Sequence, residues 1–126
     1  MRFVGLVLVA LIAAIHVYIA YFEIFAWETR GPEVFPVLPA DLFTPTVAMA
    51  ANQGLYNAFL AAGLIWALLI GDRKWQLNVA TIFLLFVFAA GVFGAATVSG
   101  RILFVQAVPS AIALILLWIG RTRDQV

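Results

Sequence analysis

The chain has 126 residues, of which 66% are hydrophobic and 10% are charged, and its formal net charge at pH 7 is +1. A water-soluble domain of this composition would expose large apolar patches, so the composition favours a membrane protein. Cysteine is absent, which excludes disulfide bonds, thiolate metal sites and thiol catalysis. The net charge offers no argument for a nucleic-acid partner, and we expect none.

Four long segments of the chain contain no Asp, Glu, Lys or Arg. Each is about as long as the roughly 20 residues of α-helix that cross a hydrocarbon layer, or longer. The sequence therefore predicts an all-α integral membrane protein whose main partner is the lipid bilayer. The four segments are Phe3–Phe22, Leu42–Gly71, Trp75–Gly100 and Ile102–Gly120.

The first helix is expected over about residues 2–27, and an outer loop, residues 28–44, follows it. The loop also carries apolar side chains, so we expect it to lie across the outer membrane interface or to fold over the helices as a lid. Four residues are expected to keep the loop out of a regular helix. They are Gly31, Pro32, Pro36 and Pro39.

Three further helices are expected at about residues 45–70, 77–98 and 102–120, joined by short turns. Residues 1–126 would then form one transmembrane domain, a four-helix bundle with up-down-up-down topology. A cleaved signal peptide is the competing interpretation of the start. It is disfavoured because the apolar run continues through Phe25, which is too far for an ordinary signal.

The basic residues are divided unevenly between the two ends of the expected helices. If the N-terminus is cytoplasmic, five of the seven basic residues lie on the inner side. This bias follows the positive-inside rule, so we expect a multi-pass protein of the inner (plasma) membrane with both termini cytoplasmic. The inner five are Arg2, Arg73, Lys74, Arg121 and Arg123, and the outer two are Arg30 and Arg101.

Polar side chains inside the expected spans are the candidates for function, because a charge at mid-bilayer costs roughly 2 to 3 kcal/mol on the insertion scale. His16 and Glu23 are seven residues apart, which places them on one helix face about 10 Å apart along the axis. Most of the polar residues fall in the outer half of the expected bundle, so we predict one outward-opening ligand pocket. The candidate binding residues are His16, Glu23, Asn52, Gln53, Tyr56, Asn57 and Gln106.

Each of these residues also has a structural interpretation. His16 and the amides of the second helix could serve as hydrogen-bonding contacts between helices. Glu23 is expected to form an ion pair with Arg101 or, if that pair is absent, to take Gln53 or Asn57 as its partner. One histidine and one glutamate are too few for a metal site, so none is expected, and the sequence identifies no cofactor.

Small residues recur at a spacing of four in the third expected helix. Such pairs let helix backbones approach closely in a membrane. They predict close packing within one bundle, with a homodimer seam as the alternative. The residues are Ala90, Gly91, Gly94 and Ala95.

A distinctive stretch opens the second expected helix, where residues 51–57 read Ala-Asn-Gln-Gly-Leu-Tyr-Asn. It resembles the signature of the domain of unknown function 1304 family of small bacterial membrane proteins. The resemblance implies a four-helix membrane architecture and carries no activity with it. It extends over most of the chain, to His16 with Tyr18, residues 23–27, residues 94–97, and residues 102–106 with Pro109.

The polar pocket in an apolar bundle favours a protein that binds a small lipophilic molecule, such as a quinone-like or isoprenoid lipid. Three alternatives stay open. The first is a proton-coupled small transporter that works as a dimer, and the second is an accessory membrane subunit. The third is an intramembrane lipid isomerase or hydrolase with His16 and Glu23 as its acid/base pair, so the sequence leaves open whether the protein is an enzyme.

Overall fold

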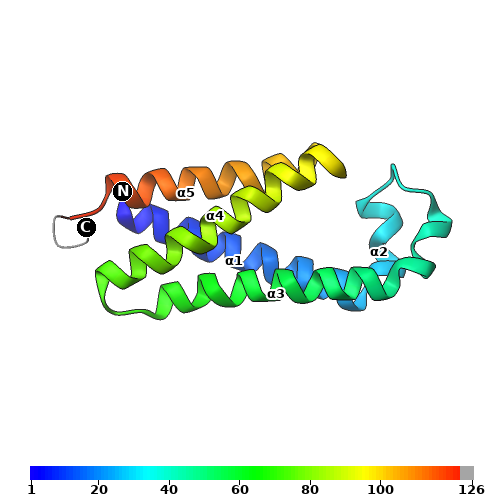
Figure 1. The fold of residues 1–126 in the computed structure, drawn as a ribbon, viewed down its shortest axis with the longest axis horizontal. Helices are drawn as coiled ribbons and strands as arrows, with labels where there is room; N and C mark the ends of the chain where they lie inside the picture. Colours follow the sequence, from blue (N-terminus) through cyan, green and yellow to red (C-terminus); the bar gives the residue numbers. More distant parts are fainter. Residues whose placement is uncertain (123–126) are drawn as a thin grey trace. The chain divides into compact units, whose positions relative to one another are not determined.

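The computed structural model describes residues 1–122, and all regular structure in this range is helical (Figure 1). The chain divides into two compact units, which are described separately. Unit 1 consists of residues 1–14 and the chain from Leu60 onward, and unit 2 consists of residues 15–59. Arg123, which is expected on the inner side, lies outside the described residues.

The prediction of an all-α fold is confirmed for the described residues, which contain five α-helices and no strand. Two of the helices, α1 and α4, are long and apolar enough to cross a membrane by length and composition. The helices are α1 (Arg2–Phe25), α2 (Trp27–Val34), α3 (Val47–Leu69), α4 (Arg73–Thr97) and α5 (Val108–Ile119). Short 3₁₀ turns at Ala40–Leu42 and Thr44–Thr46 precede α3, and a π-helix at Leu103–Ala107 precedes α5.

The core of unit 1 is built from the start of α1, the end of α3, and helices α4 and α5. Ile12, Leu64 and Leu84 are among its fully buried side chains. Helix α4 begins after Asp72, whose carboxylate accepts the backbone N–H of Trp75 at 2.8 Å and so caps the helix. Within this unit α5 runs beside α4 (Figure 1).

The expected helix over residues 102–120 contains a change of helix type. The backbone N–H of Val108 bonds to the carbonyl of Leu103, five residues earlier, which is the π-helical pattern. Pro109 has no N–H to offer the carbonyl of Val105, so the regular i to i−4 series cannot continue here. The adjacent face of α4 carries Gly91, where an added Cβ would lie 2.5 Å from the backbone nitrogen of Ala107.

In unit 2, segment 28–44 differs from the expected irregular loop, because helix α2 occupies its first part. Ala26 interrupts the helical backbone with φ −129° and ψ 18°, and α2 starts at the next residue. Pro32 lies inside α2 but removes only one backbone donor. The lack of a side chain on Gly31 lets the ring of Phe43 pack directly on α2. Packing of this kind stabilises a two-turn helix that local propensity disfavours.

Candidate functional site

The candidate site lies in unit 2, where the side-chain amide of Asn57 on α3 donates a hydrogen bond to Glu23 on α1. Asn57 Nδ2 is 2.6 Å from Glu23 Oε1 and 3.3 Å from the backbone carbonyl oxygen of Gln53. Asn57 is 8% exposed, and Glu23 is half-buried. The carboxyl group of α1 is therefore held by a buried amide from a second helix.

Gly54 explains how α3 comes close enough to α1 for this bond. It is buried one helical turn before Asn57. A Cβ atom added to Gly54 would lie 2.7 Å from Ile24 Cγ1, 3.1 Å from the Ala20 carbonyl oxygen and 3.1 Å from Glu23 Cβ. A larger residue here would push the two helices apart and lengthen the Asn57–Glu23 contact.

The two carboxyl oxygens of Glu23 differ in their hydrogen bonds. Asn57 donates to Oε1, and among the described residues no hydrogen bond to Oε2 is present. No buried side-chain nitrogen or oxygen in the described part of the chain lacks a hydrogen-bond partner. Glu23 Oε2 is therefore not completely buried. The site can accept or offer one more hydrogen bond to a bound molecule.

A cluster of four aromatic rings holds the segment that follows Glu23 against the end of α1. Trp27 is at its centre, with ring centroids 5.6 Å from Phe22, 5.9 Å from Phe35 and 5.1 Å from Phe43. Trp27 Nε1 also donates to the hydroxyl of Thr46 at 2.9 Å. The segment is thus a packed cap within unit 2.

Two polar contacts add to this cap. The Thr44 hydroxyl donates to Glu28 Oε2 at 2.8 Å and joins the two ends of the segment. The guanidinium carbon of Arg30 lies 5.6 Å from the ring centroid of Tyr18, so α2 turns back along α1. Such cation–π contacts contribute about 0.5 to 1 kcal/mol at exposed sites.

The part that the other candidate binding residues of unit 2 play in a ligand pocket stays a prediction. His16 lies seven residues before Glu23 on α1 and is fully buried. The side chains of Asn52, Gln53 and Tyr56 on α3 are exposed. Asn57 is therefore the one α3 candidate whose side chain bonds to Glu23.

The remaining predicted contacts involve residues of unit 1. Gln106 lies in the π-helix and is half-buried, and Arg101 is exposed just before it. Glu23 belongs to unit 2. A single pocket that includes Gln106 stays a prediction, and so does the Glu23–Arg101 ion pair.

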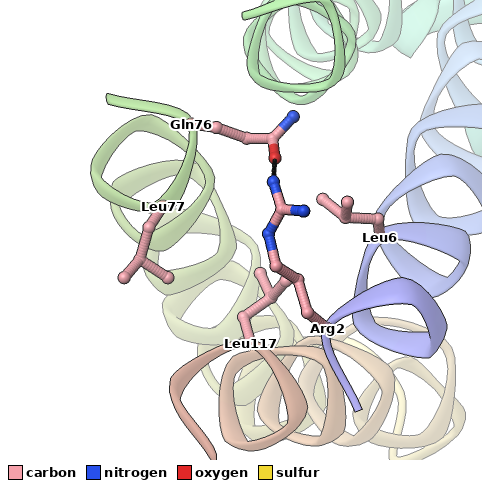
Figure 2. Close-up of a pocket in the computed structure, with 5 residues that line it drawn as sticks. All are labelled: Arg2, Leu6, Gln76, Leu77 and Leu117. Atoms are coloured by element: carbon pink, nitrogen blue, oxygen red, sulfur yellow. Dashed lines mark hydrogen bonds between the residues drawn. The ribbon is translucent and has the colours of Figure 1, made fainter. Parts of the chain in front are cut away.

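A second polar cluster, in unit 1, was not predicted from the sequence. The amide of Gln76, at the start of α4, is buried and donates to the carbonyls of Ala67 and Ile70 at 3.2 Å each. Its oxygen accepts a hydrogen bond from the guanidinium of Arg2 (Figure 2). No motif identifies Gln76, because its partners are backbone carbonyls at the end of another helix, where the regular series of helical hydrogen bonds stops.

The cavity beside this cluster is too small for a ligand. Its lining is Arg2, Leu6, Gln76, Leu77 and Leu117 (Figure 2). The cavity volume is about 10 Å³, which is room for about one water molecule. Nor do the described residues contain a group of three or more His, Cys, Asp or Glu side chains placed to hold a metal ion.

Comparisons with known proteins agree with the resemblance seen in the sequence. The profile of a family described as "Protein of unknown function (DUF1304)" matches residues 10–118. The chain is 28% identical over 117 residues to "Uncharacterized protein YpaA" of Lactococcus lactis subsp. lactis (strain IL1403), a match that covers 91% of this chain and 97% of that protein. No solved structure matches the chain significantly. Because the family profile covers most of its length, the chain belongs to the DUF1304 family.

Proposed function

We propose that this protein is a multi-pass membrane protein that binds a small lipophilic molecule through Glu23 and Asn57. Surface composition supports the membrane location. Phe3 is 77% exposed and Phe93 is 71% exposed. In the most apolar 18 residues of α1 and of α4, only 33% and 28% of the residues are buried. The core helix of a water-soluble protein would be mostly buried, whereas a helix in lipid keeps its apolar side chains on the outside.

Within this proposal, four spans run up-down-up-down: α1, α3, α4 and the segment Leu103–Ile119. Helix α3 has 23 residues, which is enough to cross a bilayer. Polar residues around Asn57 interrupt its apolar sequence.

Contacts at one end of unit 1 support the placement of both termini on the same side. Gly120, just after α5, packs directly on the backbone of Arg2 at the start of α1. Arg2 in turn bonds to Gln76 at the start of α4. The basic residues of this end agree with a cytoplasmic location under the positive-inside rule.

The ligand proposal rests on one observation: of the two carboxyl oxygens of Glu23, only Oε1 accepts a hydrogen bond from Asn57. Asn57 fixes the carboxyl group through Oε1, and Oε2 is not completely buried. An apolar site with a few fixed polar groups is typical of small-molecule binding. A lipophilic molecule with one polar end, such as a quinone-like or isoprenoid lipid, fits this arrangement. We prefer binding to lipid isomerisation because His16 is fully buried, whereas an acid/base pair needs both groups at the substrate.

Purified protein in mild detergent tests the proposal by native mass spectrometry and by thermal shift with quinone-like and isoprenoid lipids. A bound lipid at about 100 times its Kd should stabilise the fold by about 2.7 kcal/mol. We expect Glu23→Gln to weaken this stabilisation. The matched control is Glu33→Gln, which changes an exposed carboxylate on α2 and should leave the stabilisation intact. If no lipid co-purifies or stabilises the wild type, the proposed function is wrong.

A further inference from the structure

Four helix ends meet at one end of unit 1. Gln76 joins the start of α4 to the carbonyls of Ala67, in the last turn of α3, and of Ile70, just after it. The Arg2 guanidinium, at the start of α1, donates to the Gln76 side chain (Figure 2). Gly120, just after the end of α5, lies close to the backbone of Arg2. Charged side chains near these four ends therefore share one surface.

That surface is strongly basic among the described residues. The acidic residue there is Asp72, whose carboxylate is used to cap α4. The side chains of Arg73, Lys74 and Arg121 are all exposed. With Arg2, four basic groups accompany one acidic group, Asp72, among the described residues of this surface.

Two tryptophans accompany the basic groups. Trp75 is 63% exposed and Trp118 is 36% exposed. Arg121 lies 4.9 Å from the ring centroid of Trp118 and donates to the Trp118 carbonyl at 2.6 Å. Trp118 Nε1 also donates to Thr81 on α4 at 3.0 Å, which fixes the indole. Indole rings at the end of a membrane span typically lie at the depth of the lipid headgroups.

We propose that this basic surface, formed by Arg73, Lys74 and Arg121, binds the headgroup of an anionic phospholipid of the cytoplasmic leaflet. The inference rests on the membrane location in the proposed function. The cations lie next to indoles that mark headgroup depth, so the phosphate of a neighbouring lipid is within their reach. A phosphate accepts hydrogen bonds from both guanidinium and ammonium groups. This binding is separate from the lipophilic site at Glu23.

The test uses purified protein reconstituted into vesicles of neutral phosphatidylcholine, with or without 20% phosphatidylglycerol. Flotation after a carbonate wash tests the membrane location, and native mass spectrometry of the released protein measures which lipids stay bound. We expect retention of phosphatidylglycerol over phosphatidylcholine in the wild type. Lys74→Gln should reduce this preference about fivefold, as expected for loss of one charge near the surface. Arg30→Gln, in unit 2, is the matched control and should keep the preference.

The outcomes separate this inference from the proposed function. Protein that floats with the vesicles but retains both lipids equally would overturn the headgroup site alone. An equal loss of preference in Lys74→Gln and Arg30→Gln would also overturn it, because the effect would then follow total charge. Protein that leaves neutral vesicles in carbonate would overturn the membrane location and with it both proposals.

Discussion

Asn57 Nδ2 lies 2.6 Å from Glu23 Oε1, and this hydrogen bond ties α3 to α1 within unit 2. The contact joins a half-buried carboxyl group to a buried amide. Removal of Asn57 takes this donor from Glu23, and removal of Glu23 leaves the Asn57 amide with the Gln53 carbonyl as its acceptor. The bond is therefore important for stability as well as for the proposed binding of a ligand.

Replacement of Asn57 by alanine should lower the stability of the protein. The change leaves Glu23 Oε1 without its donor, and loss of one such partner costs about 1 to 2 kcal/mol. Thermal unfolding in detergent, followed by circular dichroism, measures the effect. Gln53→Ala is the control, because the side chain of Gln53 is exposed and its backbone carbonyl is retained. Equal destabilisation by the two variants would contradict the importance of the Asn57 bond.

A double-mutant cycle compares this bond with the ion pair predicted between Glu23 and Arg101. We expect Glu23→Gln and Asn57→Ala to deviate from additivity by about 0.5 to 1 kcal/mol, as residues in direct contact do. The ion pair predicts a similar deviation for Glu23→Gln combined with Arg101→Ala. It also predicts that Arg101→Ala destabilises the protein more than Arg30→Ala does. Additive effects of Glu23→Gln and Arg101→Ala would exclude the ion pair.

The contact between Glu23 and Asn57 shows how far sequence reasoning reaches. The charge-free segments were enough to predict an all-α chain, because apolar segments of about 20 residues are typical of helices that cross a membrane. The sequence offered Arg101, Gln53 and Asn57 as partners for Glu23 without a choice among them. That choice depends on the rotation of α3 and on its approach at Gly54, and helix periodicity alone determines neither.

Helix α2 and Gln76 were missed for a related reason. Local preference disfavours a helix at Gly31 and Pro32, and the ring of Phe43, distant in the chain, packs there. The Gln76 amide donates hydrogen bonds to backbone carbonyls at the end of α3. The sequence around Gln76 does not reveal these partners. In both cases the stabilising partner comes from another element, so a local pattern cannot indicate it.

Substitution of Gly91 by alanine should disrupt the packing of α4 on the π-helix. The new Cβ would meet the backbone nitrogen of Ala107 at 2.5 Å, and backbone cannot move aside as a flexible side chain does. Overpacking of this kind costs about 1 to 3 kcal/mol, which thermal unfolding in detergent would detect. Gly100→Ala is the control, because an added Cβ there meets nothing within 4 Å.

The same variant bears on the homodimer seam predicted at Ala90, Gly91, Gly94 and Ala95. Gly91 packs on Ala107 and Gly94 on Ile102 within the chain. Close packing inside one chain predicts that Gly91→Ala destabilises the monomer, whereas a dimer seam predicts a loss of dimer at unchanged monomer stability. Size-exclusion chromatography with light scattering, beside the unfolding curves, distinguishes the two.

Replacement of Trp27 by alanine should loosen the segment between α1 and α3. The variant loses the ring contacts with Phe22, Phe35 and Phe43 and the hydrogen bond to Thr46. If local opening becomes easier by about 2 kcal/mol, cleavage through the opened state becomes roughly 30-fold faster. Trypsin cleavage after Arg30, followed by mass spectrometry, measures this rate. Trp75→Ala changes an exposed indole outside unit 2, and a comparable acceleration there would argue against the aromatic cluster as the cause.

Removal of the Gln76 side chain should destabilise unit 1 more than any exposed polar substitution on α4. Gln76→Ala leaves the carbonyls of Ala67 and Ile70 without its amide and the Arg2 guanidinium without its acceptor. Loss of hydrogen bonds to buried groups costs about 1 to 3 kcal/mol. Asn78→Ala is the matched control, since Asn78 lies two residues further along α4 and is exposed. We expect a clear fall in the unfolding midpoint for Gln76→Ala and little change for Asn78→Ala. Equal midpoints for the two variants would show that the end of α3 does not need the Gln76 amide.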